Sequence, residues 1–102
     1  MRTVISAAAE ADLEQIGDYI ARDNPHRAIS FIEEIRARCL TIAKRPKAFP
    51  LMPRFKDAGI RRKIYGRYLI CFRVKPGAVE IIRVLHGARN FGPGMLFDPE
   101  PE

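Results

Sequence analysis

Residues 66–90 read GRYLICFRVKPGAVEIIRVLHGARN, and this stretch decides the fold. Two β-rich runs, 67–74 and 78–86, flank a Lys-Pro-Gly sequence at 75–77. Proline and glycine suit the central positions of a type II turn, so the two runs are predicted to form an antiparallel hairpin. A third β-rich run at 60–64 precedes them. The second half of the domain is therefore predicted to be a small antiparallel sheet.

The first half carries two amphipathic helical patterns. A helix is predicted over residues 7–22, with Ser6 as its N-cap, because apolar residues recur four, three and four positions apart, at Ala9, Leu13, Ile16 and Ile20. Asn24 and Pro25 suit the cap and the first position of a second helix, which is predicted to close at Arg45. Because the connection is very short, the two helices are predicted to form an antiparallel hairpin.

The order of the elements predicts the fold class. A short β-branched strand at 3–5 precedes the helices, and a proline-rich segment at 45–59 is expected to be an ordered loop without regular structure, packed on the core. The order β-α-α-β-β-β predicts an α+β fold in which the helical hairpin covers one face of a small, mainly antiparallel sheet. One domain is expected over residues 1–90, followed by a Pro/Gly-rich tail at 91–102.

Composition limits the classes of function. The chain has 102 residues, 47% of them apolar, which is enough for one core without disulfides or metals. Cys39 and Cys71 lie in apolar segments and are expected to be small buried hydrophobes. No spaced pair of His or Cys and no phosphate-binding Gly loop occurs, so neither a metal nor a cofactor is expected. The sequence has no signal-peptide or membrane-helix pattern, which predicts a cytoplasmic protein without a membrane partner.

Positive charge is concentrated in the middle of the sequence. Residues 1–44 have six Lys and Arg and seven Asp and Glu. Residues 45–90 have twelve basic and two acidic residues, and residues 91–102 have no basic and three acidic residues. The middle segment favours an acidic partner, either nucleic acid or an acidic protein surface; the alternative is simple solvation of a strand-rich half. Aromatic residues interleave with these cations, but Tyr68 and Phe72 are expected in the core because strand side chains alternate.

The candidate catalytic group lies at and beyond the end of the last run and consists of Arg83, His86 and Arg89. Metal-free RNA cleavage needs a base, a cation for the pentacoordinate phosphate and an acid. Strand alternation, however, points Arg83 and Leu85 one way and His86 the other, which argues against a shared catalytic face. A lone histidine at a strand end is more often structural than catalytic. The pattern therefore weakens the catalytic interpretation of these residues.

Three segments resemble the RelE/ParE superfamily of type II toxins, most closely its ParE branch: AAAEADLEQIGDYIARDNPHRAISFIEEI, the proline-rich loop, and the stretch quoted at the start. The resemblance covers about residues 2–90 and implies an antiparallel helical hairpin packed on a small antiparallel sheet. It also implies a toxin that inhibits DNA gyrase, and a ParD-like antitoxin whose tail lies across the hairpin and adds to the sheet. We expect that tail to be acidic, to match the basic middle segment.

The RelE branch supplies the alternative function, because its members are ribosome-dependent mRNA endonucleases. Arg89 falls where such nucleases carry a catalytic arginine, but Leu69 stands at the place of a second one. No Tyr follows Tyr68 and no His follows His86 to complete the nuclease set. The resemblance therefore favours gyrase binding without catalytic residues; a ribonuclease would use Arg83, His86 and Arg89.

Contact residues are expected in two groups, one for the target and one for the antitoxin. Direct binding of nucleic acid by the protein is expected only as a secondary role. The target is expected to contact arginines of the basic segment: Arg61, Arg62, Arg67, Arg83 and Arg89. The antitoxin is expected to contact apolar residues of the helical hairpin: Leu13, Ile16, Ile20, Phe31 and Ile35.

Overall fold

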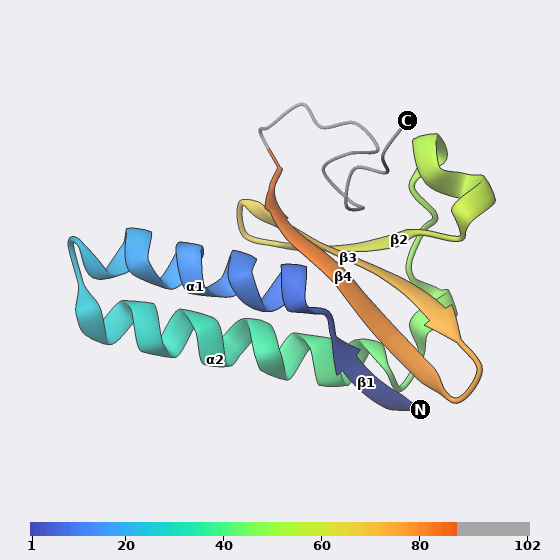
Figure 1. Ribbon diagram of the computed structural model, residues 1–102, viewed down its shortest axis with the longest axis horizontal. Helices are drawn as coiled ribbons and strands as arrows, with labels where there is room; N and C mark the ends of the chain where they lie inside the picture. The colour runs from blue at the N-terminus through green and yellow to red at the C-terminus, as the bar shows by residue number, and fades with distance from the viewer. Residues whose placement is uncertain (88–102) are drawn as a thin grey trace.

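The computed structural model describes residues 1–87 and has a helical hairpin beside a twisted sheet (Figure 1). Arg89 and the predicted tail lie outside the described residues. The elements run in the order β1 (Arg2–Ile5), α1 (Ala7–Ala21), α2 (Pro25–Ile42), the 3₁₀ helices η1 (Pro46–Ala48) and η2 (Pro53–Ala58), β2 (Arg61–Tyr65), β3 (Tyr68–Lys75) and β4 (Ala78–His86). This order confirms the predicted α+β fold.

Side-chain caps begin both helices where the sequence predicts. Ser6 Oγ accepts a hydrogen bond from the Ala9 N–H at 3.0 Å, and Asn24 Oδ1 accepts one from the Arg27 N–H at 3.0 Å. The second helix ends at Ile42, three residues before the predicted end. The reason is that the last amides, including that of Arg45, bond three residues back in a tighter turn.

The sheet has the strand order β1-β4-β3-β2. Strand β1 pairs in parallel with β4, while the other neighbours are antiparallel, so the sheet is mixed and mainly antiparallel. Gly77 adopts a φ of 73° in the β3–β4 turn, a conformation that glycine reaches without strain. Strands β1 and β2 are the two edges of the sheet.

Both faces of the sheet are covered. The hairpin packs on one face through a helix-side cluster made of Ala9, Leu13, Ile16, Ile35, Cys39, Ile42, Ala43, Ile70, Phe72, Val79, Ile81 and Val84. The proline-rich segment covers the other face through a loop-side cluster made of Met52, Phe55, Ile60, Cys71, Ile82 and Leu85. That segment packs on the core as predicted, but the expectation that it has no regular structure is wrong. Prolines begin its two 3₁₀ helices, where a missing N–H costs nothing.

A β-bulge changes the direction of side chains along β4. The register against β3 shifts by one residue at Ile82. Ile81 and Val84, three positions apart, therefore both pack in the helix-side cluster, whereas Ile82 and Leu85 pack in the loop-side cluster. Strict alternation would have placed Ile81 and Val84 on opposite faces. The bulge determines which residues at the end of β4 lie together.

The two cysteines are free and buried, one in each cluster, as predicted from the sequence. Burial raises the pKa of the Cys39 thiol to about 11 and that of the Cys71 thiol to about 12. Neither thiol is therefore activated as a nucleophile. Within residues 1–87, no helix is long and apolar enough to cross a membrane.

Candidate binding surfaces

The end of β4 forms a polar pocket of about 470 Å³ with the middle of α1 and the start of β3. We call it the strand-end pocket; its polar and aromatic lining includes Asp12, Tyr19, Arg67, Tyr68, Arg83 and His86. Arg83 and His86 thus line the same pocket, and the prediction that they point to opposite faces is wrong. The bulge is the physical reason, because Ile82 and Arg83 together oppose Cys71 and the side-chain alternation is interrupted at Arg83 itself.

Asp12 binds Arg83 at the base of this pocket. The carboxylate accepts hydrogen bonds from Arg83 Nε and Nη2, both at 2.7 Å, and from the Val84 N–H at 2.9 Å. Asp12 is only 8% exposed, and these three donors compensate its buried negative charge. The guanidinium is held in place and largely neutralised. Arg83 therefore ties α1 to β4, and less of its charge is left for a phosphate group.

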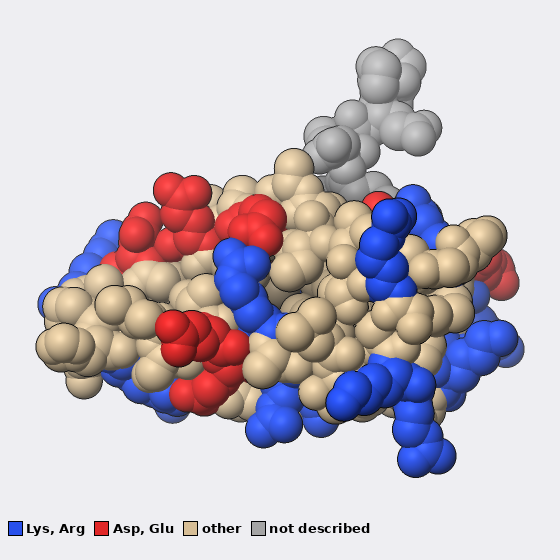
Figure 2. Space-filling model, turned by 90° about the horizontal axis from the view of Figure 1, so that it is seen from below, with Lys and Arg blue, Asp and Glu red and all other residues tan. Residues whose placement is uncertain are grey.

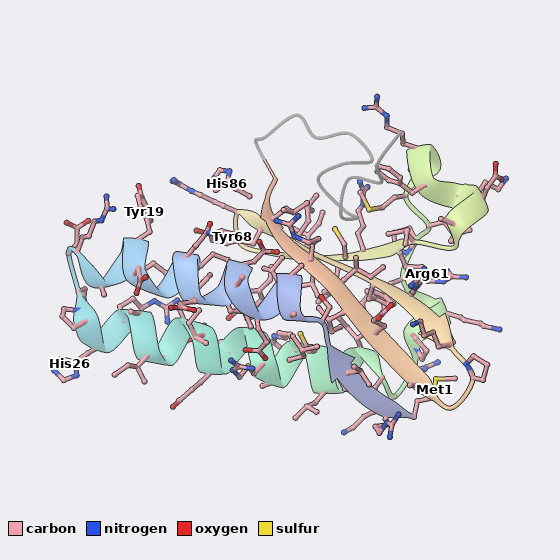
Figure 3. All side chains as sticks on the ribbon, in the orientation of Figure 1. Met1, Tyr19, His26, Arg61, Tyr68 and His86 are labelled. Carbon is pink, nitrogen blue, oxygen red and sulfur yellow. The ribbon has the colours of Figure 1, made fainter. Side chains whose placement is uncertain are left out.

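His86 packs on an aromatic residue. Its ring meets the ring of Tyr68 edge to face, with centroids 5.4 Å apart, and Tyr68 in turn packs against Phe31 at 5.6 Å. Figure 3 shows Tyr68 and His86 together at this end of the sheet, while His26 lies at the far tip of the hairpin. Phe31 and Tyr68 pack against the helix-side cluster, which confirms the core prediction for Tyr68.

A second concavity, of about 820 Å³, lies between α1 and α2. We call it the hairpin groove. Its floor consists of buried or half-buried small and apolar residues: Leu13, Gly17, Ala21, Ala28 and Ile32. Its exposed charged rim consists of Glu10, Glu14, Asp18, Glu33 and Arg36. Arg36 binds Glu10 through two bonds of 2.8 and 2.9 Å across the helices. That pair lowers the pKa of the Glu10 carboxyl.

The apolar residues that the sequence suggested for antitoxin contact lie mostly inside the protein. Ile16 and Ile35 are buried in the helix-side cluster, and Ile20 and Phe31 pack against it. Only Leu13 lines the hairpin groove, and it is 2% exposed. The helical periodicity therefore identified the face of the hairpin toward the sheet. The sequence patterns considered above missed one signal of the groove. Gly17 lies in the middle of α1, where glycine costs about 1 kcal/mol relative to alanine.

The arginines expected to contact the target do not form one cluster. Arg61 donates from Nη1 to the Phe49 carbonyl at 2.7 Å, so it anchors the proline-rich segment. Arg62 follows it on β2 and points to the other face. Arg67 is exposed in the strand-end pocket, near the bound Arg83. In Figure 3, Arg61 lies far from Tyr68 and His86.

Charge is separated along the molecule. Figure 2 shows acidic side chains gathered on the left, over the helical hairpin, with some basic side chains among them, and mainly basic side chains around the opposite end. This arrangement agrees with the sequence, in which the basic excess follows the helices. The protein offers at least two surfaces of opposite charge to its partners. Among residues 1–87, no group of three or more His, Cys, Asp or Glu side chains is placed to hold a metal ion.

Comparison with known proteins agrees with this architecture. The family model described as the ParE toxin of the type II toxin–antitoxin system parDE matches residues 4–91. No curated protein matches the chain at a significant level. A solved structure of the chromosomal ParDE toxin–antitoxin system from P. aeruginosa is similar with a TM-score of 0.72 and 22% identity, over 84% of this chain and 95% of the solved one.

That structural similarity concerns the fold, a helical hairpin on a small sheet. The resemblance implied an antiparallel sheet, whereas β1 pairs in parallel with β4 and the sheet is mixed. The family match covers nearly the whole of the described domain and includes both concavities. The chain therefore belongs to the ParE toxin family of type II toxin–antitoxin systems.

Proposed function

We propose that the protein arrests bacterial growth by binding and inhibiting DNA gyrase, and that a cognate ParD-like antitoxin neutralises it. The Asp12–Arg83 pair is the observation that supports action by binding rather than by catalysis. Its 2.7 Å bonds turn the best-placed candidate cation into a structural tether. Membership in the ParE family supports the choice of target. Gyrase acts in the bacterial cytoplasm, which is the location that the proposal requires.

The basic excess supports an acidic target surface. Residues 45–90 carry twelve Lys and Arg against two Asp and Glu. Such a surface accelerates encounter with a negatively charged complex, and gyrase engaged on DNA is one. Arg67, exposed beside the strand-end pocket, is the described arginine best placed for such a contact. Direct contact with the DNA of the complex is a secondary part of the proposal.

One observation favours a second function, metal-free RNA cleavage at the ribosome. The strand-end pocket brings Arg67, Arg83 and His86 together with Tyr68, which is the mixture of cations, base and stacking ring that RNA cleavage uses. Two contacts weigh against it. Asp12 neutralises Arg83, and His86 is packed edge to face on Tyr68.

Induction of the chain in a bacterial host separates these functions. The expected result is gyrase-dependent DNA breakage with an SOS response and intact transcripts. A purified-component assay then measures supercoiling and cleaved-DNA complexes with gyrase alone. Ribosome-dependent transcript cleavage with unbroken DNA would overturn the gyrase proposal. His86→Gln serves as the matched variant, because it removes the imidazole that lines the strand-end pocket and keeps a polar side chain of similar size.

The antitoxin half of the proposal has its own test. Co-expression of the toxin and the antitoxin encoded beside it is expected to restore growth. The two proteins are expected to copurify as a complex. Three surfaces support such binding: the edge of β1, the edge of β2 beyond the bridge of Arg61 to Leu51, and the hairpin groove. Growth arrest that persists despite a tight complex would contradict neutralisation through these surfaces.

A further inference from the structure

Three positively charged side chains lie over aromatic rings along the seam between α2 and β2. The pairs, with the distance from the charged group to the ring centroid, are Arg27 over Phe31 (5.1 Å), Arg38 over Tyr65 (5.5 Å) and Lys63 over Phe49 (5.5 Å). The rings of Phe31 and Tyr65 also pack on each other, with centroids 5.7 Å apart, so the first two pairs are neighbours. Each ring holds its cation in place, which lowers the entropic cost of ordering that side chain on binding.

The chain that leaves α2 extends this line of charge. Before it returns to the seam at Phe49, under Lys63, it carries three exposed cations: Lys44, Arg45 and Lys47. We call the following six side chains the cation row: Arg27, Arg38, Lys44, Arg45, Lys47 and Lys63. The 18 residues of α2 alone span about 27 Å at 1.5 Å per residue. In Figure 3, His26 lies at the tip of the helical hairpin and Arg61 lies far from it, beside the sheet, so the row follows the length of the molecule.

The protein compensates little of this charge itself. Within residues 1–87, Arg27 is the only member of the row that forms an ion pair, and its partner is Glu34. The hydrogen bond from Arg27 and a second one from the Tyr65 hydroxyl lower the pKa of the Glu34 carboxyl, so this acid stays ionised. The other five cations have no ion-pair partner among the described residues. Such a row attracts a partner with repeated negative charge.

A partner strand finds little room on this seam. The edge at the start of β2 is already bonded to the proline-rich segment. The Met52 N–H donates to the Ile60 carbonyl at 2.8 Å, and the Arg62 N–H donates to the Pro50 carbonyl at 3.1 Å. Residues 63–65 of β2 are what remains, which is shorter than an ordinary strand of about five residues. An acidic peptide therefore gains little from backbone pairing here.

The aromatic rings are also poorly placed for stacking on nucleic-acid bases. Proteins that hold single-stranded nucleic acid stack its bases on exposed aromatic faces. Here each ring has a cation over one face, and Phe31, Phe49 and Tyr65 are half-buried against the helix-side cluster. What the seam presents is positive charge along a line, which matches phosphate groups rather than bases. Duplex DNA carries the densest such array, about one phosphate per 1.7 Å of its axis.

We propose that the cation row binds the phosphate backbone of duplex DNA without reading its base sequence. Every base pair presents the same phosphates, so these contacts supply affinity but no sequence information. None of the residues that line the strand-end pocket belongs to the row, so a protein target and DNA can be bound by separate surfaces. That this DNA is the duplex engaged by gyrase rests on the proposed function.

Fluorescence anisotropy with a labelled duplex of about 20 base pairs tests the proposal on the full-length toxin, without gyrase. The logarithm of the binding constant is expected to fall linearly with the logarithm of the salt concentration, because neutralised phosphates release their counterions. The duplex is expected to bind more tightly than a single strand or an oligoglutamate peptide of the same charge. Absence of duplex binding at low salt overturns the proposal, and so does equal or tighter binding of the single strand or the peptide.

Variants locate the DNA on the row. Arg38→Gln combined with Lys63→Gln is expected to weaken duplex binding at least about tenfold at low salt and to reduce the salt slope by about two. Arg2→Gln combined with Lys56→Gln is the matched control, since it removes the same charge from the opposite sheet edge and from η2 on the other face. The control is expected to stay within about twofold of the wild type, with circular dichroism confirming each fold. Equal losses in both variants would mean that net charge alone matters, and would overturn the assignment to the row.

Removal of the one paired carboxylate is expected to have the opposite effect. Glu34→Gln keeps an acceptor for the Tyr65 hydroxyl and releases Arg27 for the DNA. Duplex binding is therefore expected to tighten, and the salt slope to increase by about one. Tighter binding cannot result from a loss of folding. Unchanged or weaker binding of the duplex overturns the proposed row.

Failure of this inference and failure of the proposed function give different results. If the row binds the duplex and gyrase stays active, only the proposed target falls. If gyrase is inhibited and the duplex binds independently of the row, or does not bind, only the inference about the row falls.

Discussion

Asp12 on α1 and Arg83 on β4 lie 71 positions apart in the sequence and are joined by two hydrogen bonds of 2.7 Å. The same carboxylate accepts the Val84 N–H beside the β4 bulge. One side chain therefore fixes the position of α1, the orientation of Arg83 and the backbone of β4. Because the bulge interrupts the side-chain alternation at Arg83, Arg83 and His86 line one pocket, and the pocket and the tether share one origin.

Loss of this carboxylate is expected to destabilise the fold. Asp12→Ala leaves the partly buried Arg83 charge and the Val84 N–H without their acceptor, which costs about 3–5 kcal/mol in the free energy of unfolding. Asp12→Asn keeps an acceptor and is expected to cost less. Urea unfolding followed by circular dichroism measures both, with Glu14→Ala as the exposed control. An Asp12→Ala protein as stable as the wild type would contradict the tether.

A double variant separates the pair from its surroundings. Asp12→Leu and Arg83→Met together remove both charges, so the double variant is expected to be more stable than the sum of the two single changes allows. Additive losses would mean that the two residues act independently.

The sequence predicts the elements well because their signals are local. Ser6 and Asn24 cap helices that begin one residue later, and the Pro-Gly turn fixes the last hairpin. The pocket was not predictable in the same way. The bulge at Ile82 arises from pairing between strands, and the sequence around it, EIIRVL at 80–85, reads as part of an ordinary β-rich run. A one-residue shift then placed His86 beside Arg83.

The two sides of the helical hairpin show the same limit. Periodicity identified the buried side, because burial in the core requires a continuous apolar stripe. The outer groove leaves a weaker pattern: a helix-interior glycine, an exposed isoleucine and several acids, each compatible with an ordinary solvent-facing helix. Only the antiparallel contact of α1 with α2 brings Gly17 and Ile29 into one concavity.

The histidine of the strand-end pocket is expected to be dispensable for toxicity. His86→Gln loses the ring contact with Tyr68, which is worth about 1 kcal/mol, and leaves the surrounding core intact. Growth arrest on induction is expected to stay within about twofold of the wild type, since binding to a target needs no base at this position. Complete loss of toxicity with an unchanged melting temperature would favour the ribonuclease alternative.

Both cysteines are expected to resist thiol reagents in the folded protein. Burial raises the pKa of Cys39 to about 11 and of Cys71 to about 12, so little thiolate forms at about pH 8, and both side chains are inaccessible. Reaction with a chromogenic disulfide is expected to be slow in buffer and complete in denaturant. Rapid labelling of either thiol without denaturant would mean that the sheet opens locally.

Replacement of the groove glycine is expected to stabilise the isolated toxin. Gly17→Ala removes an unfavourable helix residue, and its new methyl group meets Ile32 at an ordinary distance, so the free energy of unfolding is expected to rise by about 0.5–1 kcal/mol. Thermal unfolding measures this change. Ala28→Gly, on the facing helix, is the converse control and is expected to lower the melting temperature. A destabilised Gly17→Ala would indicate that the helices need the closest possible approach.

Glu80 is expected to contribute stability that acid removes. Burial alone would raise the pKa of its carboxyl, but the hydrogen bonds from Arg73 at 2.8 Å and Lys75 at 3.3 Å outweigh burial and lower it from 4.5. A carboxyl with a lowered folded pKa stabilises the protein above its unfolded pKa and loses that contribution as the pH falls through the folded value.

Glu80→Gln is therefore expected to be less stable than the wild type at about pH 7, and the two unfolding free energies are expected to converge as the pH falls below 4.5. Glu10 and Glu34 also have lowered pKa values, so both proteins lose stability in acid and only their difference reports on Glu80. Urea titrations at a series of pH values give that difference. A gap that stays constant with pH would mean that the Glu80 side chain acts through packing and not through its charge.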